Sequence, residues 1–188
     1  MNAIQIVRDS AQFPEVERIS ENQVNFYFDH SSRAYGNGTQ YMAVMVGVET
    51  QSDDLEEIKA LALPAIKEYR IKQIGDYDRS DNVNTFYIGG NAMWLTVDER
   101  EQIATQISAN EAIGRTEMTK WFNGHEYTFT LSEWKQMLVA LEVYAGDVLN
   151  VTEGHKSEVS SMKNADDVIN YDITKGYPEK LVFPYVTE

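Results

Sequence analysis

The chain has 188 residues, 43% of them apolar, which is enough to bury the core of one large domain or of two small ones. Thirty acidic and sixteen basic residues give a net charge of −14, and this negative field disfavours nucleic-acid backbones and anionic lipid headgroups as partners. The absence of cysteine excludes disulfides and thiolate sites, and no apolar stretch is long enough for us to expect membrane insertion.

The first fifty residues contain three apolar segments that predict strands. Residues 4–7 form a short apolar run, and Val24, Phe26 and Phe28 alternate with other residues at the period of a half-buried strand. Residues 41–48 are almost continuously apolar, as is typical of the central strand of a small sheet. Together these segments predict a β-meander.

A helix is expected after the third strand, capped by Ser52 or Asp53 and ended by Gly75. Pro64 should kink this helix or start a second piece. The polar segment 76–82 begins like a calcium-binding loop but has Asp81 where such a loop needs glycine, so we interpret it as a solvated connector. This connector divides the chain into a β-rich N-terminal docking domain at 1–75 and a hairpin–helix domain at 76–188.

The second domain uses one pattern twice: strand, glycine turn, strand, then a capped helix. Gly89-Gly90 and Asn123-Gly124 suit two-residue hairpin turns, which need positive φ at both central positions. Thr96 and Glu99 form a capping box for the first helix, and the second helix is expected to begin at Ser132. A short helix capped by Asn164 and a last strand at 181–183 complete an α+β fold.

The second helix carries a heptad seam, with steps of four and three residues between its members. Gly146 and Gly154 argue against one uninterrupted rod. Two interpretations stay open: the helix packs within its own chain, which we favour, or it forms a coiled coil between copies of the chain. The candidate interface residues are Trp134, Leu138, Leu141, Ala145, Val148, Thr152, His155, Val159 and Met162.

No motif in the sequence points to catalysis. The three histidines lie far apart, and none has a partner at the spacing of a metal site. The glycine pairs lack the lysine and hydroxyl of a phosphate-binding loop. We therefore predict no catalytic, metal-binding or cofactor-binding residues, no cofactor and no enzymatic activity. Most of the aromatic rings around the second hairpin are expected in the core, with a glycan-binding platform as the alternative.

Several short motifs follow one another in an order that is more specific than any one of them: Tyr77-Asp78-Arg79-Ser80, Val83-Asn84-Thr85-Phe86, Met93-Trp94-Leu95, Arg100, Gly114-Arg115, Trp121-Phe122-Asn123-Gly124, Leu141 to Ala145, Asn150-Val151-Thr152, His155 and Asp172 to Phe183. This series resembles an uncharacterised domain of tailed-phage and prophage proteins of gut bacteria, and covers roughly Lys67 to Phe183. Members of that family are associated with tail and tail-fibre genes, and the family has no assigned catalytic residues. The resemblance implies a tail context and leaves the first strands without a match.

Three functional hypotheses follow. The first is a non-enzymatic structural or adaptor protein of a phage tail or tail fibre, made in the host cytoplasm and located in the virion. Its partners would be other tail proteins, and this context also favours a homo-oligomer such as a trimer. The second is a cytosolic chaperone for fibre assembly. The third is a tail protein that binds or cleaves glycans with acidic residues that only folding brings together.

Overall fold

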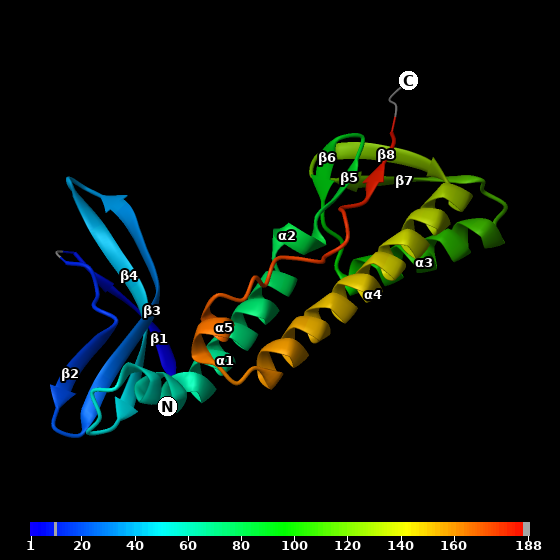
Figure 1. Ribbon diagram of the computed structural model, residues 1–188. Helices are drawn as coiled ribbons and strands as arrows, with labels where there is room; N and C mark the ends of the chain where they lie inside the picture. The colour runs from blue at the N-terminus through cyan, green and yellow to red at the C-terminus, as the bar shows by residue number, and fades with distance from the viewer. Residues whose placement is uncertain (10, 186–188) are drawn as a thin grey trace. The chain divides into compact units, whose positions relative to one another are not determined.

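The computed structural model of the protein describes residues 1–9 and 11–185, and it has the α+β fold that the sequence predicts (Figure 1). Contacts divide the chain into two units. Unit 1 comprises Met1–Gly75 and Gly154–Ile173. Unit 2 comprises Asp76–Glu153 and the described residues from Thr174 onward. The segment 154–173 therefore belongs with the N-terminal sheet, although it follows the hairpin–helix elements in the sequence.

Unit 1 is built on a four-stranded antiparallel sheet in the order β1–β4–β3–β2. Its strands are β1 (Ala3–Arg8), β2 (Val16–Ser20), β3 (Gln23–Tyr35) and β4 (Gly38–Glu49). Strands β2, β3 and β4 form a meander, and β1 lies on the other side of β4, which makes β4 the central strand expected from its apolar sequence. The sequence reading missed β2, because this edge strand has charged and polar residues between its few apolar ones.

Strands β3 and β4 continue past the rest of the sheet as a two-stranded arm (Figure 1). A register shift lies between Phe28 and Ser31, and the pairing of β1 with β4 continues past it to Tyr41, where the arm begins. Asp29 lies in the irregular segment with φ of 50°, and its carboxylate accepts a 3.0 Å hydrogen bond from Arg70 Nη2. This ion pair fixes the irregular segment of β3 to the helix that packs on the sheet.

That helix is α1 (Leu55–Asp78), which covers one face of the sheet together with the short α5 (Ala165–Ile169). Arg70 joins the two helices, since its guanidinium donates to the carbonyls of Val168 and Ile169. The buried core between sheet and helices comprises Val24, Phe26, Phe28, Val44, Val46, Val48, Ile58, Ala62, Ala65, Ile66, Ile74, Val159, Ala165, Val168 and Tyr171.

Both predicted ends of α1 are wrong. The cap is Asp54, whose carboxylate accepts from the backbone N–H groups of Glu56 and Glu57 at 2.9 and 3.0 Å. At the other end the helix runs through Gly75 to Asp78, because Gly75 does not take the left-handed conformation that ends helices. Pro64 lies inside the continuous helix, whose buried residues outweigh the one hydrogen bond that proline removes.

The two predicted hairpins are present in unit 2. Strands β5 (Phe86–Ile88) and β6 (Asn91–Met93) enclose Gly89 and Gly90, with φ of 56° and 86°. Strands β7 (Glu117–Phe122) and β8 (His125–Thr130) enclose Asn123 and Gly124, with φ of 49° and 81°. Positive φ at both central positions is the condition that the sequence indicated. The last strand, β9 (Val182–Phe183), pairs in parallel with β5.

Each hairpin leads into a capped helix. The capping box of Thr96 and Glu99 starts α3 (Val97–Ala112), as predicted. Helix α4 (Leu131–Ser161) starts one residue before the predicted Ser132, because Thr130 and Glu133 form an equivalent box with hydrogen bonds of 2.8 and 3.2 Å. The expected break in α4 is also wrong: the helix is continuous through both of its glycines.

The segment 76–82 is not the irregular connector that we expected. Its first residues finish α1, and Ser80 then caps the short helix α2 (Asp81–Asn84) by accepting from the backbone N–H of Asn82. In unit 2 the hairpins pack on α3 and α4, and the Trp134 indole N–H donates to the Met118 carbonyl at 2.8 Å. The buried core there comprises Phe86, Ile88, Met93, Leu95, Ile103, Ile107, Met118, Tyr127, Phe129, Leu131, Trp134, Met137 and Leu141.

Candidate functional site

The first part of the heptad seam lies inside unit 2. Trp134 and Leu141 belong to its core cluster, and Leu138 packs against that cluster as a half-buried side chain. Val148 is buried and Ala145 is half-buried on the same side of α4. These side chains therefore make their contacts within the chain.

The polar members of the seam are also satisfied within their own unit. In unit 2 the Thr152 hydroxyl donates to Asp78 Oδ1 at 2.8 Å and lies 3.0 Å from the Tyr177 hydroxyl. In unit 1 His155 Nδ1 lies 2.6 Å from the Tyr171 hydroxyl, which donates to Glu158. These hydrogen bonds explain the buried polar groups without a second chain.

The last two seam residues belong to the core of unit 1. Val159 is fully buried in the cluster between sheet and helices, and Met162 packs against the same cluster. All nine candidate interface residues thus lie on buried or half-buried positions of the chain, divided between the two units. The surface that α4 leaves exposed is formed by other residues.

A second apolar series on α4 points toward solvent. Val139, Val143 and Leu149 are 63%, 60% and 55% exposed, and Gly146 lies between them with open space where a Cβ atom would stand. The spacings of four, three and three residues place all four on one side of the helix. We call Val139, Val143, Gly146 and Leu149 the α4 stripe.

The α4 stripe leads at Leu149 into a pocket of about 350 Å³ in unit 2, here called the Trp94 pocket. One wall is α4, and the other is the segment from Trp94 to Val97 that connects β6 to α3. Trp94 is 46% exposed and Val97 57% exposed at this opening, whereas Phe86 and Leu95 are buried beneath it. The other α4 residues of the pocket are Leu141, Tyr144, Ala145 and Val148, so the pocket lies on the opposite side of the helix from Val139 and Val143. Stripe and pocket meet only at Leu149, and both are apolar surfaces of the kind that marks protein interfaces.

Arg100 holds the two walls of the pocket together. Its Nε donates to Glu142 Oε1 on α4 at 2.6 Å, and its Nη1 donates to the Leu95 carbonyl at 2.8 Å. Deeper in the pocket the Tyr144 hydroxyl donates to the Val83 carbonyl at 2.8 Å. Burial raises the pKa of Tyr144 above its ordinary value of 10. The walls are therefore fixed by hydrogen bonds, and the pocket is preformed.

The charge around this surface is mainly negative. Between Gln136 and Gly154, helix α4 carries Glu142, Asp147 and Glu153 and no lysine or arginine. The guanidinium of Arg100 is already engaged by Glu142, and Arg79 at the far end of the pocket pairs with Asp76 at 2.9 Å. An apolar surface with an acidic surround can bind a complementary surface.

The described residues contain no group of three or more histidine, aspartate or glutamate side chains placed to hold a metal ion. The histidines remain apart in the fold: His125 is exposed on β8, His155 is buried in unit 1, and His30 Nε2 lies 3.2 Å from the Tyr27 carbonyl oxygen. Within the same described residues no helix is long and apolar enough to cross a membrane.

The rings of the second hairpin are divided between core and surface. Tyr127 and Phe129 are buried, and Phe122 packs against them, as expected. Trp121 is 64% exposed and is the ring of this group that does not join the core. In the β7–β8 register Trp121 lies opposite Glu126, on the solvent face where the hydroxyls of Thr119 and Thr128 are 2.7 Å apart.

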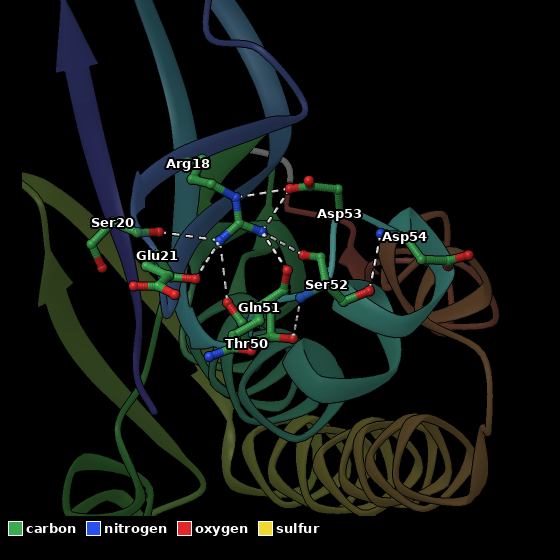
Figure 2. A network of polar contacts seen from close by, with 8 residues as sticks. All are labelled: Arg18, Ser20, Glu21, Thr50, Gln51, Ser52, Asp53 and Asp54. Atoms are coloured by element: carbon green, nitrogen blue, oxygen red, sulfur yellow. Dashed lines mark hydrogen bonds and ion pairs between the residues drawn. The ribbon is translucent and has the colours of Figure 1, made fainter.

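Unit 1 contains a separate polar network centred on Arg18 (Figure 2). Its guanidinium donates to the carbonyls of Ser20, Glu21, Thr50, Gln51 and Ser52, and to the Asp53 carboxylate at 2.8 Å. These partners come from the β2–β3 turn and from the segment between β4 and α1. The arginine joins two turns of one unit, which is a structural role.

Sequence reasoning missed the α4 stripe, although a signal for it was available. The seam is the longer and more regular series, and it accounts for the burial of α4. The exposed series at 139, 143, 146 and 149 repeats at the same helical spacing on another face. A helix with two apolar faces needs a second partner for the face that its own core does not cover. No family model, curated protein or solved structure matched the chain.

Proposed function

We propose that this chain is a non-enzymatic structural or adaptor protein of a bacteriophage tail or tail fibre, which holds another tail protein on the α4 stripe and the Trp94 pocket. The observation that carries the binding role is the exposed apolar surface of α4 and its surroundings, which comprises the stripe on one side of the helix and the preformed pocket on the other, with Leu149 common to both. The tail context comes from the resemblance over residues 67–183, which include both the stripe and the pocket.

The energetic argument favours a binding role for this surface. Full burial of one large apolar side chain is worth about 1.5–3 kcal/mol, and association must offset at least several kcal/mol of lost freedom. Leu149, Trp94 and Val97 all line the pocket and are each about half exposed, so a partner that covers these three gains a useful part of this free energy. The walls are already fixed by Arg100 and Tyr144, which reduces the cost of ordering the site.

The test is to purify virions from an infected or induced host and to identify their proteins by mass spectrometry. We expect this chain in the particles, and we expect a Leu149→Asp variant to be lost from them while it is still made in the cell. An Ile113→Asp variant is the matched control, because Ile113 is 70% exposed on unit 2 outside the stripe.

Absence of the wild-type chain from finished virions contradicts the structural role. If the chain then co-purifies with isolated fibre chains from the cell lysate, the assembly chaperone becomes the better assignment. Retention of both the Leu149→Asp and the Ile113→Asp variants in virions contradicts the use of this surface, whatever the location of the protein.

A further inference from the structure

We infer that the partner segment on the α4 stripe is an amphipathic α-helix whose apolar side is flanked by lysine and arginine. The inference rests on the proposed function in that both use the same surface, and it adds the chemistry of the occupant. Two features carry it: the geometry of the stripe and the charge around it.

The geometry of the stripe suits a helix. Val139 and Leu149 are ten positions apart along α4, or about 15 Å at a rise of 1.5 Å per residue. The backbone groups of α4 bond within the helix, so the stripe offers side-chain contacts and no free strand edge. A helix likewise satisfies its own backbone and presents apolar side chains at steps of three and four residues.

Gly146 lies in the middle of the stripe and has nothing within 4 Å of the place where a Cβ atom would stand. This gap lets the axis of a second helix approach toward the shorter end of the usual packing distance of about 8–10 Å. A glycine inside an exposed helix costs about 1 kcal/mol relative to alanine. Close approach of a partner gives this costly residue a use that the chain alone does not.

The negative charge around the stripe favours basic residues on either side of the apolar face of the partner helix. Glu142, Asp147 and Glu153 are the charged residues of α4 in this region, and α3 adds Asp98 and Glu101 on its exposed side. Lysine or arginine beside the apolar residues of the partner complements these groups and speeds the encounter with a chain of net charge −14. A second copy of this chain would bring the same acidic groups, which disfavours self-association through the stripe.

The experiment uses the full chain and two synthetic helical peptides of 18 residues. One has leucine on one side and lysine on the other, and the second has glutamate in place of every lysine. Fluorescence anisotropy of the labelled peptides measures binding at physiological ionic strength. We expect the lysine peptide to bind and the glutamate peptide to show no binding.

The decisive variant is Val143→Asp. It adds a negative charge, so it strengthens any purely electrostatic attraction to the lysine peptide while it removes an apolar contact. We expect binding to weaken at least tenfold. Ile113→Asp makes the same change of charge at an exposed apolar residue outside the stripe, and we expect no loss of binding.

A second variant, Gly146→Ala, keeps the test valid if Val143→Asp does not fold. The added methyl group blocks close approach without adding charge, so we expect several-fold weaker binding and an intact fold by circular dichroism. Equal binding of the lysine peptide by wild type, Val143→Asp and Gly146→Ala overturns the inference, and so does a dimer that Val143→Asp dissociates in light scattering. The virion test is independent of these outcomes, so the two proposals can fail separately.

Discussion

At the residue scale, Arg18 makes more hydrogen bonds than its exposed edge-strand position suggests. One planar guanidinium holds five backbone carbonyls and the Asp53 carboxylate, from two turns that are about thirty residues apart in the sequence (Figure 2). An arginine suits this role because its donors form a fixed fork, whereas a lysine ammonium is a compact point charge. The turns of unit 1 therefore depend on the shape of one side chain as well as on its charge.

We predict that Arg18→Ala destabilises unit 1 by about 2 kcal/mol, since hydrogen bonds from a charged donor contribute about 1.5–3 kcal/mol and solvent replaces part of them. Arg18→Lys should recover little of this loss. All three tryptophans are in unit 2, so hydrogen exchange of peptides spanning 16–26 and 50–58 is the suitable measurement. Arg33→Ala is the control, because Arg33 is exposed and bonds only to Gln40 among the interactions found for it. Similar exchange in both variants would contradict the prediction.

Glu99 makes unit 2 sensitive to acid. Hydrogen bonds from the backbone N–H and the hydroxyl of Thr96 lower the pKa of Glu99 below its ordinary value of 4.5. Because the folded pKa is the lower one, this carboxylate contributes stability above pH 4.5 and loses that contribution as the pH falls through the folded pKa. The cap is therefore complete at neutral pH and weakened in acid.

We predict that Glu99→Gln lowers the urea midpoint of tryptophan fluorescence at pH 7 and that its difference from wild type disappears as the pH approaches 3. The amide can still accept the Thr96 hydrogen bonds, so the loss at neutral pH should be small, below about 1 kcal/mol. Glu117→Gln is the control at an exposed glutamate outside the cap, and it should follow wild type at every pH. A constant difference between Glu99→Gln and wild type across this range would argue against the assigned cause.

At the element scale, the features that could be predicted are those set by neighbouring residues. The turns at Gly89-Gly90 and Asn123-Gly124 and the Thr96–Glu99 box depend on local backbone chemistry, and the structure confirms all three. The ends of α1 and the continuity of α4 depend on packing against elements that are distant in sequence, which local signals do not contain. Glycine ends a helix only where it takes positive φ, and neither Gly75 nor Gly146 does so.

For the candidate site, too, the sequence predicts the features that depend on local spacing and misses those that depend on distant elements. The periodicity of α4 correctly identified a face that needs burial, but the sequence could not say which elements cover it or which apolar residues remain outside. Val139, Val143 and Leu149 stand out only after the core has taken Trp134, Leu141 and their neighbours. The Trp94 pocket could not be predicted, because its walls come from separate helices and a connecting segment.

We predict that Gly146→Ala and Gly154→Ala each stabilise the protein by about 1 kcal/mol, since both glycines are inside α4 with open space at the Cβ position. Gly124→Ala should destabilise, because Gly124 has φ of 81°. Chemical denaturation followed by tryptophan fluorescence measures the unit 2 positions, and hydrogen exchange measures Gly154. A loss of stability in Gly146→Ala would mean that α4 is not regular at this point.

At the scale of the whole molecule, each unit has its own buried cluster. Two of the three boundaries between the units fall inside α1 and α4, and the third lies between Ile173 and Thr174. The heptad seam contributes to both clusters. A helix that supplies side chains to two cores has its buried face fixed along its entire length, which leaves the opposite face as the part available to another protein.

We predict that Leu141→Asp unfolds unit 2, whereas Val143→Asp leaves the chain folded with unchanged mass. Leu141 is buried in the core cluster, and an unpaired buried carboxylate is strongly destabilising. Val143 lies two residues away on the exposed face. Circular dichroism and light scattering measure fold and mass. If Leu141→Asp instead stayed folded and changed the mass from that of an oligomer to that of one chain, the seam would lie between copies.

Two of the hairpin turns, β3–β4 and β7–β8, contain an asparagine–glycine pair, which affects the chemical stability of the purified protein during storage. Asn37-Gly38 and Asn123-Gly124 are both exposed, and asparagine is among the residues most prone to chemical damage. When the glycine nitrogen attacks the asparagine side-chain carbonyl, ammonia is lost, and hydrolysis of the resulting ring leaves aspartate or isoaspartate. Isoaspartate adds a methylene to the main chain, which the two-residue β7–β8 turn does not fit. We therefore expect species of greater negative charge to accumulate during storage. Isoaspartate at Asn123 should also disturb the register between β7 and β8.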